Sequence, residues 1–486
     1  MADLTTESLS KCREESPSGS AAFRFIDLFA GVGGFHAALS AFGGDCVYAV
    51  EIDQAAARVY ERNWGLDPLG DVTKDANDEV MAVGDHEILA AGFPCQPFSK
   101  SGAQKGMDET RGTLYWNILK IIQARKPEIV LLENVRNLAG PRHLHEWQVI
   151  IETLRDEGYH VSEVPAVFSP HQLPPEYGGQ PQVRDRVLIT ATRIPAALEG
   201  SSELAFDPGP VRFPKVDWNP KAEWHLEDLL DDADNTPGCE LTTSERLWID
   251  AWNEFVELMW ERREGRRLPG FPLWADSWRD VADAWRSDKK TVPDVLRIPH
   301  IDPALPAWKR SHLAKNYEFF AAHHRVIREW AEKWGIYTTA FPASRRKLEW
   351  QAQDTPRLWD TVMHLRPSGI RCKAPTYLPA LVAITQTSII GPRQRRLSPR
   401  ETARLQGLPD TFDFGNQRPA ATYKQMGNGV NVGVVWNVLR EHVRRDEALL
   451  KQTPAGRRIL GAVLEAPLSP HQVLEAHRPH GVQVVP

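Results

Sequence analysis

The chain is poor in cysteine and has no long hydrophobic run. Its 486 residues include five cysteines, an odd number, which are widely scattered and form no CxxC pair or His/Cys cluster with zinc spacing. We therefore expect neither a disulfide framework nor a bound metal, and we expect a reducing compartment. No apolar run reaches the roughly 18 residues of a membrane helix, and the N-terminus has no signal-peptide core, so the sequence predicts a cytoplasmic protein without a membrane segment.

The sequence also lacks an excess of positive charge. A formal net charge of −6 argues against a protein coated with basic residues for nucleic-acid binding, but it allows local basic patches. One patch contains Arg393, Arg395 and Arg396, together with Arg400 and Arg404, and another spans residues 344–347. Taken alone, each patch is more simply explained as a solvated face of a helix or loop.

Strand and helix patterns dominate the first part of the chain. Residues 1–22 are rich in Ser and Glu, and we expect them to be disordered. From Phe23 to about Arg193, short apolar strands alternate with amphipathic helices, which predicts βαβ units and a mostly parallel sheet. We expect strands at 25–29, 46–50, 87–91, 129–132 and 187–190, and helices at 114–125 and 145–157.

The character of the sequence changes around Pro195. Residues 200–390 hold most of the tryptophans, and we predict helices there at 244–262 and 317–334. Tryptophans at helical spacing favour a hydrophobic core over a platform for stacking bases; the pairs are Trp248 with Trp252 and Trp330 with Trp334. Regular patterns return at 397–439, and we expect residues 451–486 to form a loosely attached tail.

A glycine-rich turn, Phe29-Ala-Gly-Val-Gly-Gly34, follows the first predicted strand. Glycines let the backbone approach a ligand closely while helix N–H groups face it. Glu51 directly follows the second strand, where an acidic residue can bind ribose hydroxyls. Asp71 could reach an adenine or be an ordinary turn residue. The pattern fits a nucleoside cofactor without distinguishing a dinucleotide from S-adenosylmethionine, although the glycine spacing departs from G-x-G-x-x-G.

One cysteine lies between two prolines in the segment Gly92-Phe-Pro-Cys-Gln-Pro-Phe-Ser99. Pro94 and Pro97 fix φ near about −65° on either side of Cys95, which would hold its thiol as a nucleophile. A buried, inert cysteine explains this segment equally well when it is considered alone. The polar, glycine-bearing loop that follows, up to residue 112, is long enough to close over a substrate.

Polar side chains also follow later strands. Glu133 emerges from an apolar strand, so its pKa should be raised enough to share a proton near neutrality, unless it is a salt-bridged loop residue. Arg184 and Arg186 alternate along an extended segment and could clamp an anion or a ring carbonyl. The segment Gln425-Met-Gly-Asn-Gly-Val430 could bring a second loop to the cofactor.

In chain order these motifs closely resemble those of the cytosine-C5 DNA methyltransferases: FAGVGG, GFPCQPFS, ENV, QVRDR, RRLSPRETARLQGLPD and QMGNGV. The resemblance covers residues 24–193 and 393–440. It implies an α/β fold with a Rossmann-like, S-adenosylmethionine-dependent methyltransferase sheet and a second, smaller target-recognition domain. We expect the catalytic domain at 23–194 and 415–450 and the target-recognition domain at 195–414, with DNA between them.

The resemblance also implies roles for individual residues. Cys95 would add to carbon 6 of a flipped-out cytosine, Glu133 would hold the ring N3, Arg184 would hold the O2 carbonyl, and Arg186 would support the glutamate and the cysteine. The residues expected to contact S-adenosylmethionine are Phe29, Gly31, Gly33, Glu51, Ile52, Asp71, Val72, Pro94, Asn428, Gly429 and Val430. Those expected to contact DNA are Gln96, Ser101, Arg393, Arg395 and Arg396.

The sequence departs from the family at two places. Gly429 stands where serine is usual, which should loosen the last cofactor loop without abolishing binding. The Thr-Leu pair typical of the recognition domain is not obvious, and Ala380-Leu381 is the nearest candidate.

The resemblance predicts methylation of carbon 5 of cytosine in a specific double-stranded DNA sequence, as the modification arm of a restriction-modification or phage-defence system. A cognate restriction endonuclease would be encoded separately. We expect a monomer on DNA that associates with the nucleoid and uses no metal. The alternatives are a tRNA cytosine-C5 methyltransferase, an inactive DNA-binding relative and a Rossmann oxidoreductase. The large recognition domain counts against the first, and intact Cys95, Glu133 and Arg184 count against the second.

Overall fold

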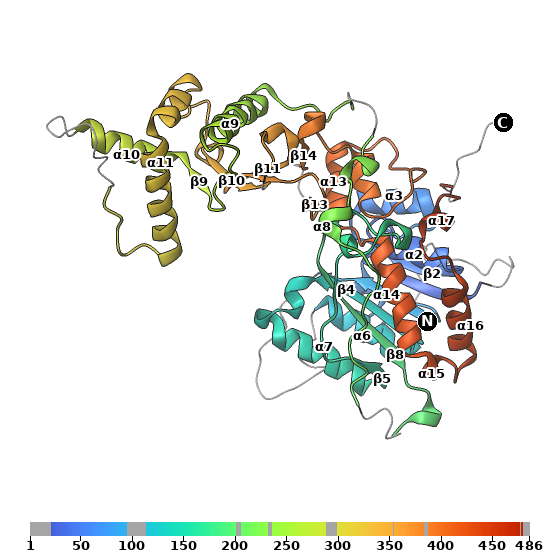
Figure 1. Ribbon diagram of the computed structural model, residues 1–486. Helices are drawn as coiled ribbons and strands as arrows, with labels where there is room; N and C mark the ends of the chain where they lie inside the picture. The colour runs from blue at the N-terminus through green and yellow to red at the C-terminus, as the bar shows by residue number, and fades with distance from the viewer. Residues whose placement is uncertain are drawn as a thin grey trace, which may run out of the picture. The chain divides into compact units, whose positions relative to one another are not determined.

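The computed structural model describes residues 21–94, 113–200, 206–231, 236–287, 299–352, 354–382, 387–476 and 478–479. The chain divides into two compact units (Figure 1). Unit 1 comprises Met1–Trp224, Pro379–Thr385 and Pro399–Pro486, and unit 2 comprises His225–Leu378 and Gln386–Ser398. Within the described ranges, no helix combines the length and the apolar character needed to cross a bilayer.

Unit 1 is built on a seven-stranded sheet with the order β2-β1-β3-β4-β8-β5, in which β6 also pairs with β8. Its strands are β1 (Phe23–Leu28), β2 (Gly44–Val50), β3 (Ile88–Gly92), β4 (Ile129–Val135), β5 (Tyr159–Val161), β6 (Val167–Phe168) and β8 (Arg186–Arg193). The first four strands run parallel, as the sequence predicted. The pairs that β8 makes with β4, β5 and β6 are antiparallel, so the sheet is mixed and methyltransferase-like rather than wholly parallel.

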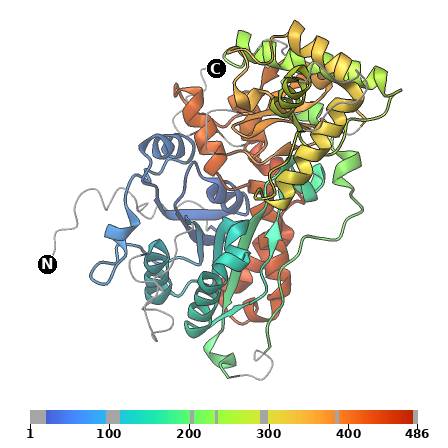
Figure 2. The same ribbon diagram turned by 90° about the vertical axis from the view of Figure 1, so that its left-hand side faces the viewer.

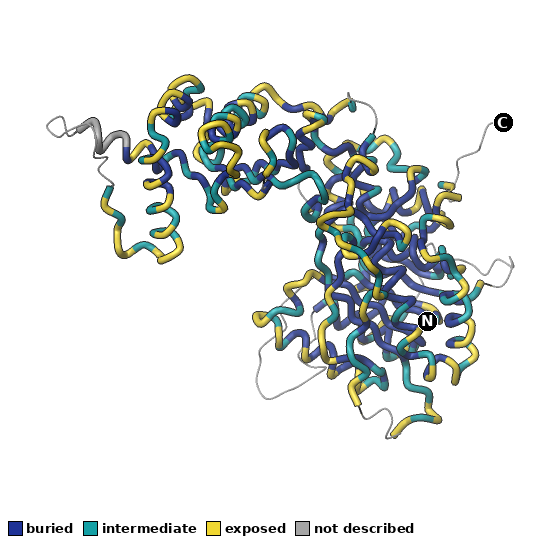
Figure 3. The backbone as a smooth tube through the Cα atoms, in the orientation of Figure 1, coloured by how far each residue is buried: buried dark blue, intermediate teal, exposed yellow. Residues whose placement is uncertain are grey.

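Helices cover both faces of this sheet. The teal helices α6 and α7 in Figure 2 lie on one side of the strands, and the red helices α14 and α16 lie on the other. Alternate residues of β8 divide accordingly, since Ile189 packs with α6 and α7 while Leu188 packs with Val434 and Val438 of α14. The strands of unit 1 are dark blue along most of their length in Figure 3, as expected for strands buried on both faces.

The helices of unit 1 begin and end close to the predicted positions where a prediction was made. They are α2 (Gly34–Ala41), α3 (Gln54–Trp64), α4 (Val72–Asp75), α6 (Leu114–Arg125), α7 (Leu144–Asp156), α8 (Pro220–Glu223), α12 (Pro399–Arg404), α13 (Pro419–Asn428), α14 (Val432–Arg445), α15 (Glu447–Leu450), α16 (Pro454–Glu465) and α17 (His471–Leu474). The predicted helix at 114–125 coincides with α6, whose N-cap Thr113 accepts a hydrogen bond from the Trp116 N–H.

Unit 2 combines a six-stranded sheet with three long helices. The strand order is β15-β14-β11-β12-β10-β9. The strands are β9 (Leu273–Trp274), β10 (Lys347–Gln351), β11 (Val362–Arg366), β12 (Gly369–Lys373), β14 (Ile389–Ile390) and β15 (Arg395–Arg396), and the helices are α9 (Thr243–Arg262), α10 (Ala275–Ser287) and α11 (Ala307–Lys333). Trp252 and Trp330 are buried together with Trp278 in the core between helices and strands, which confirms their prediction as core residues.

Helix α11 begins ten residues earlier than the sequence predicted. Residues 307–315 are half-buried or exposed, so they show no clear apolar face from which a helix could be recognised. The helix also bends at His323, whose φ of −128° is not helical.

The boundary between the units differs from the expected one at 195. Trp218 and Trp224 both donate from Nε1 to the carbonyl oxygen of His171, at 3.2 and 2.9 Å, which attaches the segment before His225 to unit 1. At the other end, α12 already belongs to unit 1, sixteen residues before the expected return at 415.

The segment from residue 452 to residue 467, which we expected to be loosely attached, is packed against α14. Ile459 and Val463 of α16 are fully buried, and Arg440 of α14 donates to the carbonyl oxygens of Ala466 and Pro467 at 2.8 Å. The spacing of Ile459 and Val463 is the i, i+4 pattern of one apolar helix face, which is the signal that the sequence prediction overlooked.

Ile459→Ala should therefore lower the free energy of unfolding by about 2–4 kcal/mol, because it opens a cavity under α16. Urea unfolding followed by circular dichroism measures this change. Glu465→Ala, on the exposed end of the same helix, should change it by less than about 0.5 kcal/mol. Equal stability of the two variants would show that α16 is not anchored.

Candidate active site

The glycine loop after β1 is held in a left-handed backbone conformation. Phe29, Gly31 and Gly33 have φ of 58°, 57° and 93°. A Cβ on Gly33 would lie 2.2 Å from Nε1 of Trp64, so only glycine fits there. The same Nε1 donates to the Val32 carbonyl at 3.0 Å, which ties the loop to the end of α3. The backbone N–H of Gly31 donates to Glu51 at 2.8 Å, which joins the loop to the end of β2.

Two acidic residues lie near the glycine loop, Glu51 directly after β2 and Asp71 at the start of α4. One carboxylate oxygen of Glu51 accepts from Gly31, and the other accepts from the Asp53 N–H at 2.7 Å, so the group is oriented by the backbone. Asp71 caps α4, accepting from the N–H and the hydroxyl of Thr73 at 3.0 and 2.7 Å. Asp71 thus has the ordinary capping role, and it also lines the pocket described next.

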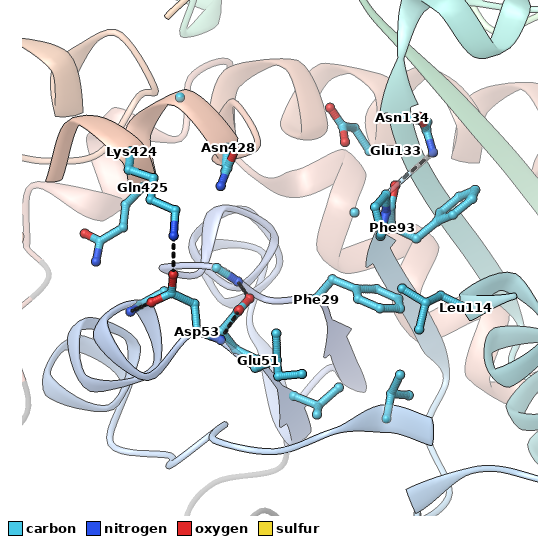
Figure 4. A pocket seen from close by; sticks show the side chains of 18 of the residues that line it. Phe29, Glu51, Asp53, Phe93, Leu114, Glu133, Asn134, Lys424, Gln425 and Asn428 are labelled. Carbon is cyan, nitrogen blue, oxygen red and sulfur yellow. Dashed lines mark hydrogen bonds and ion pairs between the residues drawn. The ribbon is translucent and has the colours of Figure 1, made fainter. Parts of the chain in front are cut away.

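These elements surround a pocket of about 450 Å³ in unit 1. Figure 4 shows its walls: the β1 and β2 loops on one side, the β3 and β4 ends on another, and α13 above. The pocket is lined by most of the residues predicted to bind cofactor, namely Phe29, Gly31, Glu51, Ile52, Asp71, Val72, Pro94 and Asn428.

The remaining predicted cofactor residues, Gly33, Gly429 and Val430, do not line the pocket directly. Gly33 shapes the glycine loop, and the carbonyl of Val430 lies against Gly34, where a Cβ would come within 2.4 Å of its oxygen. Gly429 ends α13, and its N–H donates to the Gln425 carbonyl at 2.8 Å. All three act from behind the pocket wall.

An ion pair at the pocket was not predicted from the sequence. Lys424 of α13 donates from Nζ to Oδ2 of Asp53 at 2.7 Å, and both residues line the pocket (Figure 4). The hydrogen bond from Lys424 lowers the pKa of Asp53, and the carboxylate in turn raises the pKa of Lys424. The two residues are 371 positions apart, and no local pattern could have paired them.

Glu133 lies at the end of β4 and is almost completely buried. Burial raises the pKa of its carboxyl group, against the opposing effect of Arg186 and Arg184, as the sequence predicted. It is also salt-bridged, since Nε of Arg186 lies 2.9 Å from Oε1 of Glu133. Both residues line the pocket, so a carboxyl group that retains a proton easily faces it together with a guanidinium.

The described part of the cysteine loop ends at Pro94, which lines the same pocket as Glu133. Asn134 donates from Nδ2 to the Phe93 carbonyl at 2.8 Å, which fixes the chain just before Pro94 at the pocket. Cys95, Gln96 and Ser101 lie outside the described residues.

Arg184 does not occupy the position predicted for it. Its side chain is buried and donates to the carbonyl oxygens of Leu381, Gly427 and Gly429 at 3.0, 2.9 and 2.7 Å. Burial, with Arg186 nearby, lowers its pKa to about 9. The sequence prediction gave Arg184 a ring carbonyl to hold, whereas the structure uses both terminal nitrogens to tie the end of α13 to the Ala380–Leu381 segment of unit 1. Arg186 is the arginine that faces the pocket.

The arginines predicted to contact DNA are engaged inside unit 2. Arg393 donates to Glu227 at 2.9 Å, and Arg396 donates to Glu245 at 2.5 Å. Arg395 is buried, and it donates to the carbonyl oxygen of Arg396 at 3.0 Å. Arg393 and Arg396 thus form ion pairs within unit 2, and their contact with DNA stays a prediction. The sequence pattern located a basic patch but not its internal partners.

Replacing Arg184 should destabilise the protein more than replacing an exposed arginine nearby. Arg184→Gln should lower the free energy of unfolding by about 3 kcal/mol, since it removes charge-assisted hydrogen bonds to buried carbonyl groups. Arg136→Gln is a matched control, because Arg136 pairs with Asp185 at the surface, and it should cost less than about 1 kcal/mol. Denaturant unfolding distinguishes them, and wild-type stability of Arg184→Gln would contradict the structural role.

Comparison with known proteins agrees with this geometry. A family model described as C-5 cytosine-specific DNA methylase matches residues 23–444. The chain is 57% identical to the type II methyltransferase M.AluI of Cellulosimicrobium cellulans, over 92% of this chain and 96% of that protein. It is 42% identical to the type II methyltransferase M.HhaI of Haemophilus parahaemolyticus, over 85% and 91%. The crystal structure of S. pombe Dnmt2 methyltransferase aligns at 18% identity and a TM-score of 0.41, over 88% of this chain and 99% of that one.

Most of the chain is covered both by the family model and by relatives well above 30% identity. The chain therefore belongs to the C-5 cytosine-specific DNA methylases, and it is a restriction-modification DNA (cytosine-5-)-methyltransferase that acts on double-stranded DNA with S-adenosylmethionine as methyl donor.

Proposed function

We propose that the pocket of unit 1 holds S-adenosylmethionine on its glycine-loop side and the target cytosine on its Glu133 side. The observation that carries the proposal is the meeting, in one pocket, of Glu51 and Asp71 with the Glu133–Arg186 pair. The residues present suit the methyl donor. Gly31 leaves open space where a Cβ would stand, and the oriented Glu51 carboxylate can accept from ribose hydroxyls.

The reacting base must leave the DNA stack before these groups can reach it. Glu133, in its protonated form, donates to the ring N3, and Arg186 donates to the ring oxygen in place of Arg184. Cys95, one residue beyond Pro94, adds its thiolate to carbon 6, and the electron pair moves to carbon 5. Carbon 5 then attacks the methyl group of S-adenosylmethionine, the bond between sulfur and methyl breaks, and the sulfur leaves as the neutral thioether of S-adenosylhomocysteine. Loss of the carbon 5 proton and of the Cys95 sulfur restores the aromatic ring.

Unit 2 would supply target recognition. M.AluI is similar over almost the whole chain, which supports the same recognition sequence for this enzyme. We further propose that the enzyme works as a monomer in the cytoplasm, on nucleoid DNA, beside a separately encoded restriction endonuclease.

The covalent step is tested by trapping. Duplex DNA that carries 5-fluorocytosine at the target position should form a covalent complex with the wild-type protein when S-adenosylmethionine is present, because fluorine cannot leave as a proton does. Cys95→Ser should form no complex and transfer no tritiated methyl group, yet still bind DNA. Gel electrophoresis under denaturing conditions detects the complex. Methylation by Cys95→Ser, or efficient methylation of tRNA in place of duplex DNA, would refute the proposal.

The role of Glu133 is tested by pH dependence. Burial raises its pKa, so the protonated, donating form is present at lower pH and is lost as pH rises through that value. The wild-type rate should therefore fall on the alkaline side because of this group. Glu133→Gln should reduce turnover by about 100-fold and lack that alkaline decline, since an amide does not titrate.

Glu128→Gln is a matched control for the loss of a buried carboxylate. Glu128 lies just before β4 and pairs with Arg193 at 2.6 Å, away from the pocket. It should keep the wild-type pH profile. An unchanged alkaline decline in Glu133→Gln would remove Glu133 from the proton-donating role.

A further inference from the structure

The sheet of unit 2 has one apolar face and one polar face. Met363 and Leu365 of β11, with Ile370 and Cys372 of β12, belong to the core that also contains Trp252 of α9, Trp278 of α10 and Trp330 of α11. Because side chains alternate across a strand, the intervening residues of β10, β11 and β12 lie on the opposite face. That face carries Lys347, Glu349 and Gln351 of β10, Val362, His364 and Arg366 of β11, and Gly369, Arg371 and Lys373 of β12.

Strand register brings the basic residues of this face together. Arg371 lies between Glu349 on β10 and His364 on β11. One step along, Lys373 pairs in register with Gln351 and Val362. One step the other way, Gly369 is opposite Arg366 and adjoins Lys347, and it leaves no side chain between the two cations.

The positive charge of this face is poorly balanced. Its four cations, Lys347, Arg366, Arg371 and Lys373, are accompanied by one carboxylate, Glu349, which lies 2.6 Å from Arg371. Within the described parts of the chain, Lys347, Arg366 and Lys373 make no ion pair with a carboxylate. This contrasts with Arg393 and Arg396, whose charges are met by Glu227 and Glu245.

The electrostatics of the face favour an anion from outside. Partial burial and repulsion from neighbouring cations lower the pKa of both Arg366 and Lys373. His364, whose pKa burial and the same cations depress to about 3, stays neutral and bonds with the hydroxyl of Ser388 at 3.1 Å. A bound polyanion would relieve this repulsion and release the counterions that the cations otherwise hold.

We propose that the face formed by Lys347, Arg366, Arg371 and Lys373 contacts the phosphate backbone of the DNA substrate. The proposal rests on the function proposed above, and it moves the phosphate contacts from residues 393–396 to the strands β10, β11 and β12. All four side chains are half-buried, so their charged ends are supported by rigid strands and remain reachable. Arg371 and Lys373 stand about 7 Å apart along β12, and Lys347 and Arg366 lie on the two strands that flank β12, about 10 Å apart, a spacing that suits a row of phosphates.

The test measures DNA affinity of the full-length protein at several salt concentrations. Arg366→Gln combined with Lys373→Gln should weaken binding by about 10-fold or more on two duplexes, one with the methylated sequence and one without it. The slope of log affinity against log salt should become shallower by about two, because two phosphate contacts are lost. S-adenosylmethionine affinity and the melting temperature should stay unchanged.

Arg325→Gln combined with Lys315→Gln is the matched control. Both residues are exposed on α11 of the same unit, and their replacement removes the same charge. It should leave the affinity and the salt slope almost unchanged. If the two double variants weaken DNA binding equally, the loss of net charge alone explains the effect, and the proposal is overturned.

Other outcomes overturn it in distinguishable ways. If DNA binding is weakened only on the duplex that contains the enzyme's target sequence, without a change in salt slope, these residues read bases and do not bind phosphates. If the unaltered protein methylates DNA but the double variant Arg366→Gln, Lys373→Gln binds DNA as tightly as it does, this inference alone would be refuted. Absence of DNA methylation by the wild-type protein would refute the proposed function itself.

Discussion

The active site depends on one buried contact, the 2.9 Å ion pair between Arg186 and Glu133. The buried strand β4 delivers the carboxyl group to a place where water cannot solvate its charge, and the antiparallel strand β8 delivers the guanidinium that offsets this cost. Burial raises the pKa of this carboxyl group, and the arginine opposes that rise. Asn134, the next residue, holds the Phe93 carbonyl, so the cysteine loop starts beside the same pair. The mixed sheet of unit 1 is therefore also the frame of the chemistry.

Much of this frame was predictable because its signals are local. Short apolar runs at 129–132 and 187–190, too short for helices, indicate buried strands, and a polar residue at the carboxyl end of a parallel strand lies at the sheet edge where ligands bind. For this reason the pattern placed Glu51 and Glu133 at the ends of strands, and both line the pocket, as do Asp71 and part of the glycine loop. Trp252 of α9 and Trp330 of α11 were recognisable as core residues from their helical spacing with Trp248 and Trp334, which pack against the same core.

The features that the sequence did not reveal share a physical cause, which is that the partner of the residue lies far away in the chain. Arg184 was expected at the substrate, but the carbonyl groups of residues 381, 427 and 429 take its donors. Arg393 and Arg396 read as a patch for phosphates until Glu227 and Glu245 are seen beside them. The boundary at His225 depends on two tryptophans that reach His171. Charge in a sequence shows where ions are, and only the fold shows which of them are already neutralised.

The contact between Lys424 and Asp53 has a consequence for the synthesis of the enzyme on the ribosome. One wall of the pocket is translated near the start of the chain and the other 371 residues later. At the ribosomal rate of about 5–20 residues per second, the glycine loop waits on the order of 20–75 s for its counterpart. A nascent chain thus carries the cysteine and the glutamate long before it can enclose a methyl donor. The wall formed by α13 joins the pocket only once synthesis has passed residue 428.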